Sequence, residues 1–299
     1  MSDLHKVILQ GPAARDDKVS GHLFRDLLDV LVEGSKRSLR FRLEGRSTFK
    51  GPQPKWLRTA ADFDLLREPG LGASSAVIQA RPLVETMPER FQQGDLFVDL
   101  DPRKSPVELF EDALEDALRG DADSERFDEE LIATFKKFEG LLKHGIERIK
   151  VVNGRTLRVD ARALERVREL ARSSFAPQRV RVAGRLEEIR YSDCRFSLVL
   201  GSGATLQGTA LDLGHEALKE HFGRTVVVTG MAAFRPSGRP LCIDAERIEP
   251  ASERDTQLWS ALPKPLLAPF PGRQLHEEQR TRGRLTALLE ERRGKALRH

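Results

Sequence analysis

Seven side chains between residues 178 and 250 have the chemistry that binding of single-stranded nucleic acid requires. Cations along a groove neutralise phosphates, and aromatic rings stack on bases. The candidate residues are Arg181, Arg185, Tyr191, Arg195, Phe234, Arg235 and Arg239. The alternative is that the arginines form a solvated outer face and that Phe234 belongs to a core. This stretch has ten Lys and Arg residues and nine Asp and Glu residues, so its net charge alone does not favour nucleic acid.

Four residues of the segment 39–58 could bind nucleic acid in the same way: Arg40, Arg42, Lys55 and Trp56. Apolar residues alternate with Arg40 and Arg42 over residues 39–43, which predicts a half-buried strand with a basic outer face. Pro52 and Pro54 then predict a loop around Lys55 and Trp56.

The charges of the chain are separated along its length rather than evenly spread. Residues 36–58 carry eight Lys and Arg residues and one acid, whereas residues 85–130 carry sixteen acids and five cations. Residues 280–299 are again basic, with seven cations and two acids. Because the first two segments are close in sequence, we favour pairing between them over phosphate binding by the segment 36–58.

The best enzymatic pattern is Asp99, Asp101 and Lys104, at the end of a strand predicted over residues 95–100. This arrangement is distantly similar to a metal-dependent nuclease site. We favour the alternative of a polar strand end that leads into a helix capped by Ser105. The glycine-rich segments lack the lysine of a phosphate-binding loop, and the histidines lack the spacing of metal ligands. The sequence therefore predicts no catalytic residue, metal or cofactor.

Residues 178–250 also alternate apolar and polar side chains as β-strands do. Three strands, a short helix and two further strands are predicted in that order. A change of phase after Leu186 predicts a β-bulge at Glu187 and Glu188. Leu218 and Phe222 of the helix are expected to close one end of the resulting barrel.

This order of elements resembles the OB-fold, a five-stranded Greek-key barrel with a helix between its third and fourth strands. An SH3-like barrel is the main alternative, and the position of the helix argues against it. The resemblance covers about a quarter of the chain and is topological. It implies a ligand-binding module, although barrels of this kind bind nucleic acids, sugars and proteins alike.

The remaining chain predicts an overall α+β fold with three regions. Residues 1–175 form a mixed α+β domain, residues 178–250 the barrel, and residues 251–299 a proline-rich linker with a basic helical tail over residues 274–297. In the first region a helix begins at Ser20 and ends at Gly34. The other predicted elements of this region are strands at residues 5–10 and 75–80, helices near residues 84–91, 106–120, 124–145 and 161–173, and a hairpin around Asn153 and Gly154.

The composition is that of an ordinary soluble protein, with 39% hydrophobic and 32% charged residues. No apolar run approaches the roughly 20 residues that span a bilayer, and the N-terminus does not resemble a secretory signal. Cys194 and Cys242 are expected to be reduced thiols. We therefore expect a cytoplasmic, bacterial-type protein without a membrane partner.

Three classes of function are compatible with these features. The first is a non-enzymatic nucleic-acid-binding or regulatory protein that uses the OB-like barrel and the basic segments, with single-stranded nucleic acid as its partner. The second is a protein-interaction component, such as an antitoxin-like or antiviral-defence protein, whose barrel or C-terminal tail binds another protein. The third, ranked well below, is a nuclease-like enzyme with an unrecognised site in residues 1–175.

Overall fold

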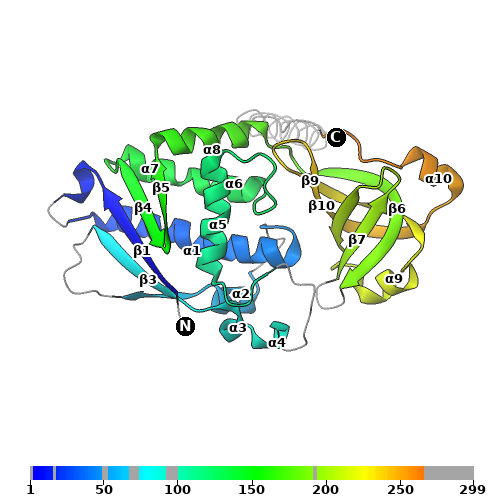
Figure 1. The fold of residues 1–299 in the computed structure, drawn as a ribbon, viewed down its shortest axis with the longest axis horizontal. Helices are drawn as coiled ribbons and strands as arrows, with labels where there is room; N and C mark the ends of the chain where they lie inside the picture. Colours follow the sequence, from blue (N-terminus) through cyan, green and yellow to red (C-terminus); the bar gives the residue numbers. More distant parts are fainter. Residues whose placement is uncertain are drawn as a thin grey trace, which may run out of the picture. The chain divides into compact units, whose positions relative to one another are not determined.

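The computed structural model describes residues 3–15, 18–48, 53–66, 74–91, 100–190 and 194–265 (Figure 1). Residues 1–265 form one compact unit that contains both helices and strands, so the predicted α+β class is confirmed. The strands form an open five-stranded sheet and a closed five-stranded barrel. Asp99, Tyr191 and the predicted helix at 274–297 lie outside the described residues.

The open sheet has the strand order β2-β3-β1-β4-β5, and each neighbouring pair is antiparallel. Its strands are β1 (Asp3–Gln10), β2 (Phe63–Leu66), β3 (Ser75–Ala80), β4 (Arg148–Asn153) and β5 (Arg155–Asp160). β1 is central, and its Val7 and Leu9 are buried against the helices. The predicted hairpin is β4–β5, with Gly154 at a positive φ of 63°.

Several helices begin at a capping side chain. Ser20 accepts a hydrogen bond from the backbone of Leu23, Ser105 forms a capping box with Glu108, and Asp160 caps the last long helix before the barrel. The helix predicted to begin at Ser124 and end at Gly145 begins instead after Asp128 and is divided at Lys137, so its predicted start was wrong. The elements are η1 (Pro12–Ala14), α1 (Gly21–Glu44), α2 (Lys55–Ala60), α3 (Leu83–Thr86), α4 (Pro88–Phe91), α5 (Pro106–Arg119), α6 (Glu129–Lys136), α7 (Phe138–Lys143) and α8 (Ala161–Ser173).

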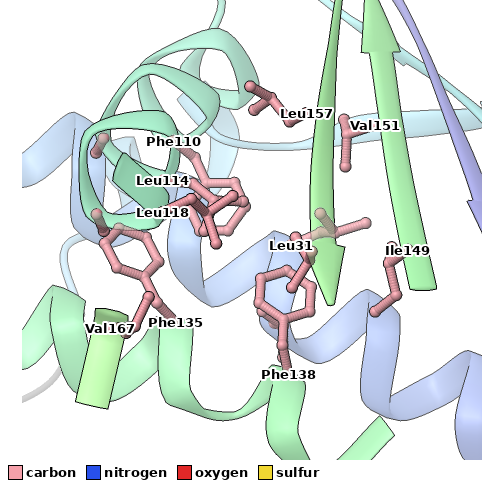
Figure 2. Packing of buried hydrophobic residues seen from close by; sticks show 14 of the residues in the cluster. Leu31, Phe110, Leu114, Leu118, Phe135, Phe138, Ile149, Val151, Leu157 and Val167 are labelled. Carbon is pink, nitrogen blue, oxygen red and sulfur yellow. The ribbon is translucent and has the colours of Figure 1, made fainter. Parts of the chain in front are cut away.

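The core between the sheet and these helices contains a group of phenylalanines (Figure 2). The ring of Phe110 on α5 lies 5.7 Å from that of Phe135 on α6, measured between centroids. A Cβ atom at Gly34 of α1 would lie 2.2 Å from the Phe110 ring. The prediction that the helix ends at Gly34 was therefore wrong. Gly34 instead allows α1 and α5 to approach closely.

Residues 39–43 are the last turns of α1 and not a strand, so that prediction was wrong. The alternation arose because this end of the helix is buried on two sides. Leu39 and Leu43 pack into a small cluster with Leu57, whereas Phe41 packs into the main core. Arg40 between them is also buried and donates a hydrogen bond to Glu44, one turn later, at 2.6 Å. A helix with few exposed positions loses its 3.6-residue pattern.

Residues 178–250 form the predicted barrel. The strands are β6 (Gln178–Arg190), β7 (Arg195–Leu200), β8 (Thr205–Thr209), β9 (Thr225–Phe234) and β10 (Pro240–Pro250), with α9 (Gly214–Glu220) between the third and fourth. The closed order is β10-β8-β7-β6-β9, and β8 pairs with β10 in parallel. The OB-like topology is therefore confirmed. A register shift between Leu186 and Glu188 is the predicted bulge.

The barrel has its own hydrophobic core, formed by the predicted inward rows. Leu218 of α9 closes the core, as expected. Phe222 does not, because 56% of its surface is exposed. The ring of Phe196 lies over Gly208 on the neighbouring strand, where a Cβ atom would be only 2.3 Å from it.

The chain continues along the barrel after Pro250. A further helix, α10 (Glu253–Leu258), is capped by Ser252. The carbonyl of Trp259 accepts a hydrogen bond from the backbone N–H of Ala183 on β6 at 2.7 Å, and Leu262 packs against the barrel core. The first residues of the predicted linker thus cover part of the barrel wall.

Candidate functional site

The most accessible group of cationic and aromatic side chains lies where α10 meets strand β6. The guanidinium of Arg181 lies 5.7 Å from the centre of the Trp259 ring, which is within cation–π distance. Asp255 of α10 is 3.8 Å from the same guanidinium, at the outer limit of an ion pair. Ser252 holds Asp255 through hydrogen bonds that lower its pKa. The carboxylate therefore stays ionised beside Arg181.

An open pocket of about 510 Å³ lies beside this pair. We call the residues around it the β6–α10 surface; they are Arg179, Val180, Arg181, Thr229, Leu258, Trp259, Ala261 and Pro263. Arg179 forms an exposed ion pair with Glu246 at 2.8 Å. The surface thus combines two arginines, a half-buried indole and several apolar groups. This composition suits a ligand with a flat ring and a negative charge.

Arg185, the second predicted arginine of β6, is also exposed. Its side chain is 63% accessible, and its nearest carboxylate, that of Glu187, is 3.8 Å away. Arg181 and Arg185 therefore share a strand and accessibility, as the sequence predicted. Tyr191, predicted to provide a stacking ring nearby, lies outside the described residues.

The other predicted arginines of the barrel bind other parts of the same protein. Arg195 donates to the carbonyl of Arg42 at 2.8 Å, near the C-terminal end of α1. Arg235 donates to the carbonyl of Asp123 at 2.9 Å and pairs with Glu125 at 2.6 Å. These contacts give both arginines a structural role, and they are not grouped with Arg181.

The last two predicted barrel residues, Arg239 and Phe234, differ in their surroundings. Arg239 lies 3.6 Å from Asp123, in a weak and exposed ion pair. Phe234 is only 5% exposed and packs edge-on against Phe175, with ring centroids 6.4 Å apart. In this conformation Phe234 is part of the barrel core, which was the alternative that the sequence left open.

The basic segment 36–58 is divided among several environments. Arg40 is buried beside Glu44, and Arg42 lines a small pocket next to α5. Lys55 and Trp56 form the start of α2 and not a loop, so that prediction was wrong. Lys55 is exposed, whereas Trp56 packs against the cluster around Leu57. None of these residues lines the pocket beside Arg181, although the backbone carbonyl of Arg42 accepts the hydrogen bond from Arg195.

An ion pair and hydrogen bonds among the described residues join the basic segment to the acidic one, which we expected to pair with it. Arg37 pairs with Glu130 at 3.0 Å. Ser47 adds two hydrogen bonds to Asp128, from its backbone N–H at 2.9 Å and its hydroxyl at 2.6 Å. Burial raises the pKa of Asp128, although these bonds and one from Leu131 act in the opposite direction.

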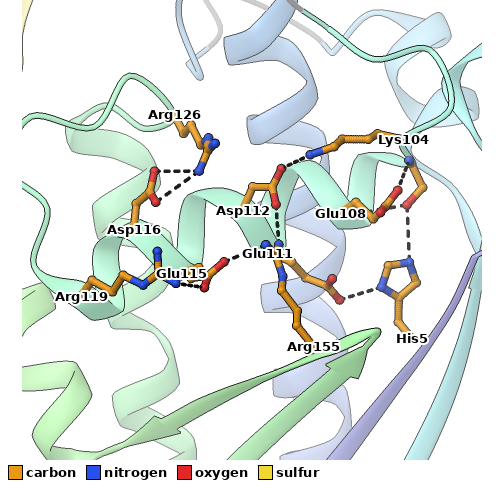
Figure 3. A network of polar contacts seen from close by, with 11 residues as sticks. His5, Lys104, Glu108, Glu111, Asp112, Glu115, Asp116, Arg119, Arg126 and Arg155 are labelled. Carbon is orange, nitrogen blue, oxygen red and sulfur yellow. Dashed lines mark hydrogen bonds and ion pairs between the residues drawn. The ribbon is translucent and has the colours of Figure 1, made fainter.

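A second polar region surrounds α5, whose acidic residues recur at helical spacing (Figure 3). Asp112 accepts hydrogen bonds from Lys104 and Arg155, and Asp116 pairs with Arg126 at 3.2 Å. Burial alone would raise the pKa of Asp112, but the hydrogen bonds from the two cations lower it on balance. Asp112 is therefore ionised, and neighbouring cations pair with both carboxylates.

A buried chain connects Ser105, the N-cap of this helix, through His5 of β1 to Glu111 of α5 (His5 and Glu111 are labelled in Figure 3). His5 Nδ1 lies 2.6 Å from Glu111, and its Nε2 lies 3.4 Å from Ser105 Oγ. The order is that of a hydrolytic triad. However, all three side chains are buried, and Ser105 Oγ accepts the capping hydrogen bond from Glu108. The arrangement joins β1 to α5 and offers no access to a substrate.

Of the predicted nuclease-like residues, Asp101 and Lys104 line the same small pocket next to α5, but their side chains engage different partners. Asp101 accepts hydrogen bonds from Arg103, which lower its pKa, and Lys104 binds Asp112. Asp99 lies outside the described residues. Among the described residues, no group of three His, Cys, Asp or Glu side chains is arranged to hold a metal. Burial raises the pKa of Cys242 to about 12, so its thiol is protonated.

The sequence did not identify Trp259 as a candidate, because it follows the predicted barrel. Its proximity to Arg181 depends on the path of α10 across β6, which no local pattern reveals. The charges of α5 could have been recognised, since Glu108, Asp112 and Asp116 are spaced at one-turn intervals. Their cationic partners come from other segments of the chain, so the sequence pattern of α5 could not reveal them.

In the part of the chain that the structure describes, no helix has both the length and the apolar composition to span a membrane. No protein-family model matches the chain, and neither a curated protein nor a solved structure matches it.

Proposed function

We propose that the chain is a non-enzymatic protein that binds single-stranded nucleic acid on the β6–α10 surface. The observation that carries this proposal is the position of the Arg181 guanidinium, 5.7 Å from the Trp259 ring beside an open pocket. An indole offers a face on which any base can stack, and a nearby guanidinium adds charge for the phosphate. The ligand would therefore be recognised with little dependence on sequence.

The arginines of β6 provide a track for the phosphate backbone. Arg179, Arg181 and Arg185 have side-chain exposures of 65%, 42% and 63%. From the first to the last, the strand extends about 20 Å at roughly 3.3 Å per residue. An OB-fold commonly covers about 4–16 nucleotides of a single strand. The length of the track therefore suits the lower part of this range.

Acidic neighbours limit the affinity that this surface can reach. Asp255 and Glu187 each lie 3.8 Å from an arginine of β6. Exposed pairs of this kind contribute about 0–1 kcal/mol each, so a phosphate can displace them at small cost. We expect binding of modest affinity that weakens as the salt concentration rises.

The chain allows a direct test of stacking, because it contains two tryptophans, Trp56 and Trp259. In a Trp56→Phe variant, Trp259 is the only tryptophan that reports. Its fluorescence should be quenched when a single-stranded DNA or RNA of about 12 nucleotides is added at low salt. Trp259→Ala should weaken binding by about 1–3 kcal/mol, and Trp56→Phe should leave it unchanged. A wild-type protein that binds no single strand at low salt contradicts the proposal.

The second candidate function is binding of a protein partner on the same surface. It is favoured by Leu258, which is 62% exposed next to Trp259, and by the neighbouring Pro263. Exposed apolar and aromatic groups in one place are typical of protein interfaces. A Leu258→Ser variant separates the two functions. It should leave stacking on Trp259 intact but weaken an apolar protein interface.

A further inference from the structure

A small polar pocket lies next to α5, away from the residues that form the β6–α10 surface. Its volume is about 190 Å³, below the roughly 300–1,000 Å³ of typical pockets for drug-sized ligands. Three cations from separate segments line it: Arg42 of α1, Lys104 before α5 and Arg126 after α5. Two carboxylates, those of Asp101 and Asp112, complete its polar lining. The lining therefore carries one net positive charge.

Both carboxylates of the pocket are occupied by cationic partners. Asp101 accepts hydrogen bonds from the backbone and the guanidinium of Arg103. Asp112 accepts hydrogen bonds from Lys104 and from Arg155, which does not line the pocket. At Asp112 burial would raise the pKa, but the hydrogen bonds from Lys104 and Arg155 lower it on balance. At Asp101 the hydrogen bonds from Arg103 lower the pKa. Both acids are thus ionised and already paired.

Two of the cations, Lys104 and Arg126, retain hydrogen-bond donors. A lysine has three N–H donors and an arginine five. Within the described part of the chain, the ammonium of Lys104 bonds only to Asp112. The guanidinium of Arg126 bonds there only to Asp116, and only through Nη1. The pocket therefore has more donors than acceptors.

We propose that this pocket binds a phosphate group, held by Lys104 and Arg126 with Arg42 at its side. A doubly charged tetrahedral anion offers several strong acceptors to the remaining N–H groups, and a guanidinium can bind two of its oxygens at once. The volume admits a phosphate or a small phosphate ester but not a whole nucleotide chain. The ligand is either a free phosphate compound or the terminal phosphate of a strand. This inference does not depend on nucleic-acid binding by the barrel.

The first test uses the full-length protein and inorganic phosphate. Titration calorimetry should detect saturable binding of phosphate, and phosphate should raise the melting temperature. Sodium chloride at the same ionic strength should do neither. An equal effect of chloride, or no saturable binding of phosphate, overturns the proposal.

The second test assigns the binding to the pocket. Lys104→Gln and Arg126→Gln should each weaken phosphate binding about tenfold or more, because each removes charge-assisted hydrogen bonds. Arg119→Gln is the matched control. Arg119 also pairs with a carboxylate of α5, that of Glu115, but does not line the pocket, so phosphate binding should not change. Unchanged binding in both pocket variants overturns the assignment.

A folding defect must be separated from a binding defect, since Arg126 also neutralises Asp116. Arg126→Lys keeps a positive charge beside this acid but lacks the planar fork. It should melt close to the wild type and still bind phosphate several-fold more weakly. If Arg126→Lys folds and binds phosphate as the wild type does, the guanidinium does not hold the anion and the proposal fails.

The source of the phosphate is decided with two otherwise identical oligonucleotides, one with a 5′-phosphate and one with a 5′-hydroxyl. Tighter binding of the phosphorylated strand, lost in Arg126→Gln, assigns the pocket to a strand end. Equal binding of both strands, with inorganic phosphate still bound, assigns it to a free phosphate compound. Both results support the pocket, and neither requires Trp259, so failure of the barrel site remains distinguishable.

Discussion

The barrel has arginines in two regions, and the two regions use them in opposite ways. On the β6–α10 surface, Arg181 and Arg185 are exposed and lie 3.8 Å from their nearest carboxylates. Where the barrel contacts α1 and the loop after α5, Arg195 and Arg235 donate to backbone carbonyls at 2.8 and 2.9 Å. Residue type alone therefore does not identify a binding arginine. The exposure of the side chain and the partners that it already engages distinguish the two groups of arginines.

The contact region contains other close polar contacts that support this distinction. Arg46, just after α1, pairs with Asp244 of β10, and Asp244 also accepts from Thr209 at 3.2 Å. The thiol of Cys242 lies 3.0 Å from the carbonyl of Gly45. The contacts of Arg46 and Gly45 join the barrel to the end of α1, and the one from Thr209 holds Asp244 within the barrel. Cations in this region stabilise the fold, whereas Arg181 and Arg185 of β6 have exposed side chains and only long contacts to carboxylates.

The largest expected difference between the two kinds of site concerns aromatic residues. Phe234→Ala should lower the free energy of unfolding by about 3–5 kcal/mol, because it removes a ring from the barrel core. Trp259→Ala should cost considerably less, since the indole is half-buried at the surface. Denaturant unfolding followed by circular dichroism measures both. If Phe234→Ala retains wild-type stability but loses nucleic-acid binding, the ring belongs to the binding surface.

The arginines should show the same contrast with a smaller effect. Arg195→Ala removes a hydrogen bond from a charged donor to a backbone carbonyl, which typically stabilises a protein by about 1.5–3 kcal/mol. Arg185→Ala, the exposed counterpart on β6, should change the free energy of unfolding by about 0.5 kcal/mol or less. Urea unfolding of the two variants compares them directly. Equal losses of stability would remove the distinction between the two regions.

The sequence predicted the barrel well because its structure is specified locally. Alternating rows such as Val180 and Val182 define each strand, and the phase change after Leu186 corresponds to the bulge. Capping residues such as Ser105 and Asp160 likewise fixed helix starts from a few neighbouring residues. Where structure depends on such short-range patterns, the sequence was sufficient.

Prediction failed where burial depends on distant segments. Residues 39–43 alternate like a strand because two separate clusters bury the end of α1. Gly34 looked like a helix end, but its role depends on Phe110, far along the chain. The order of the open sheet also depends on distant pairs, since β1 lies between β3 and β4.

The candidate site was predicted in part for the same reason. Arg181 and Arg185 follow from the alternation of β6, so their exposure could be inferred from the strand alone. Trp259 could not be associated with them, because α10 returns to β6 only in the folded chain. The structural use of Arg195 depends on carbonyls of α1, more than 150 residues earlier.

The smallest effect is the most specific test of the β6 arginines. Arg181→Gln combined with Arg185→Gln should flatten the dependence of log affinity on log salt, by about 0.7 for each lost contact with a single-strand phosphate. Affinity near physiological salt should fall by roughly tenfold, because the contribution of each contact grows as the salt concentration falls below about 1 M.

A control for this double variant is available on strand β10. Arg247 is 64% exposed, like Arg185, and pairs with Glu249 at 3.4 Å. It does not line the β6–α10 pocket. Arg247→Gln should therefore leave the salt dependence as it is in the wild type. If it flattens the salt dependence as much per residue as the β6 substitutions do, phosphates contact the barrel without preference for β6. Binding would then reflect general attraction to surface arginines, and the distinction between exposed and engaged cations would describe stability alone.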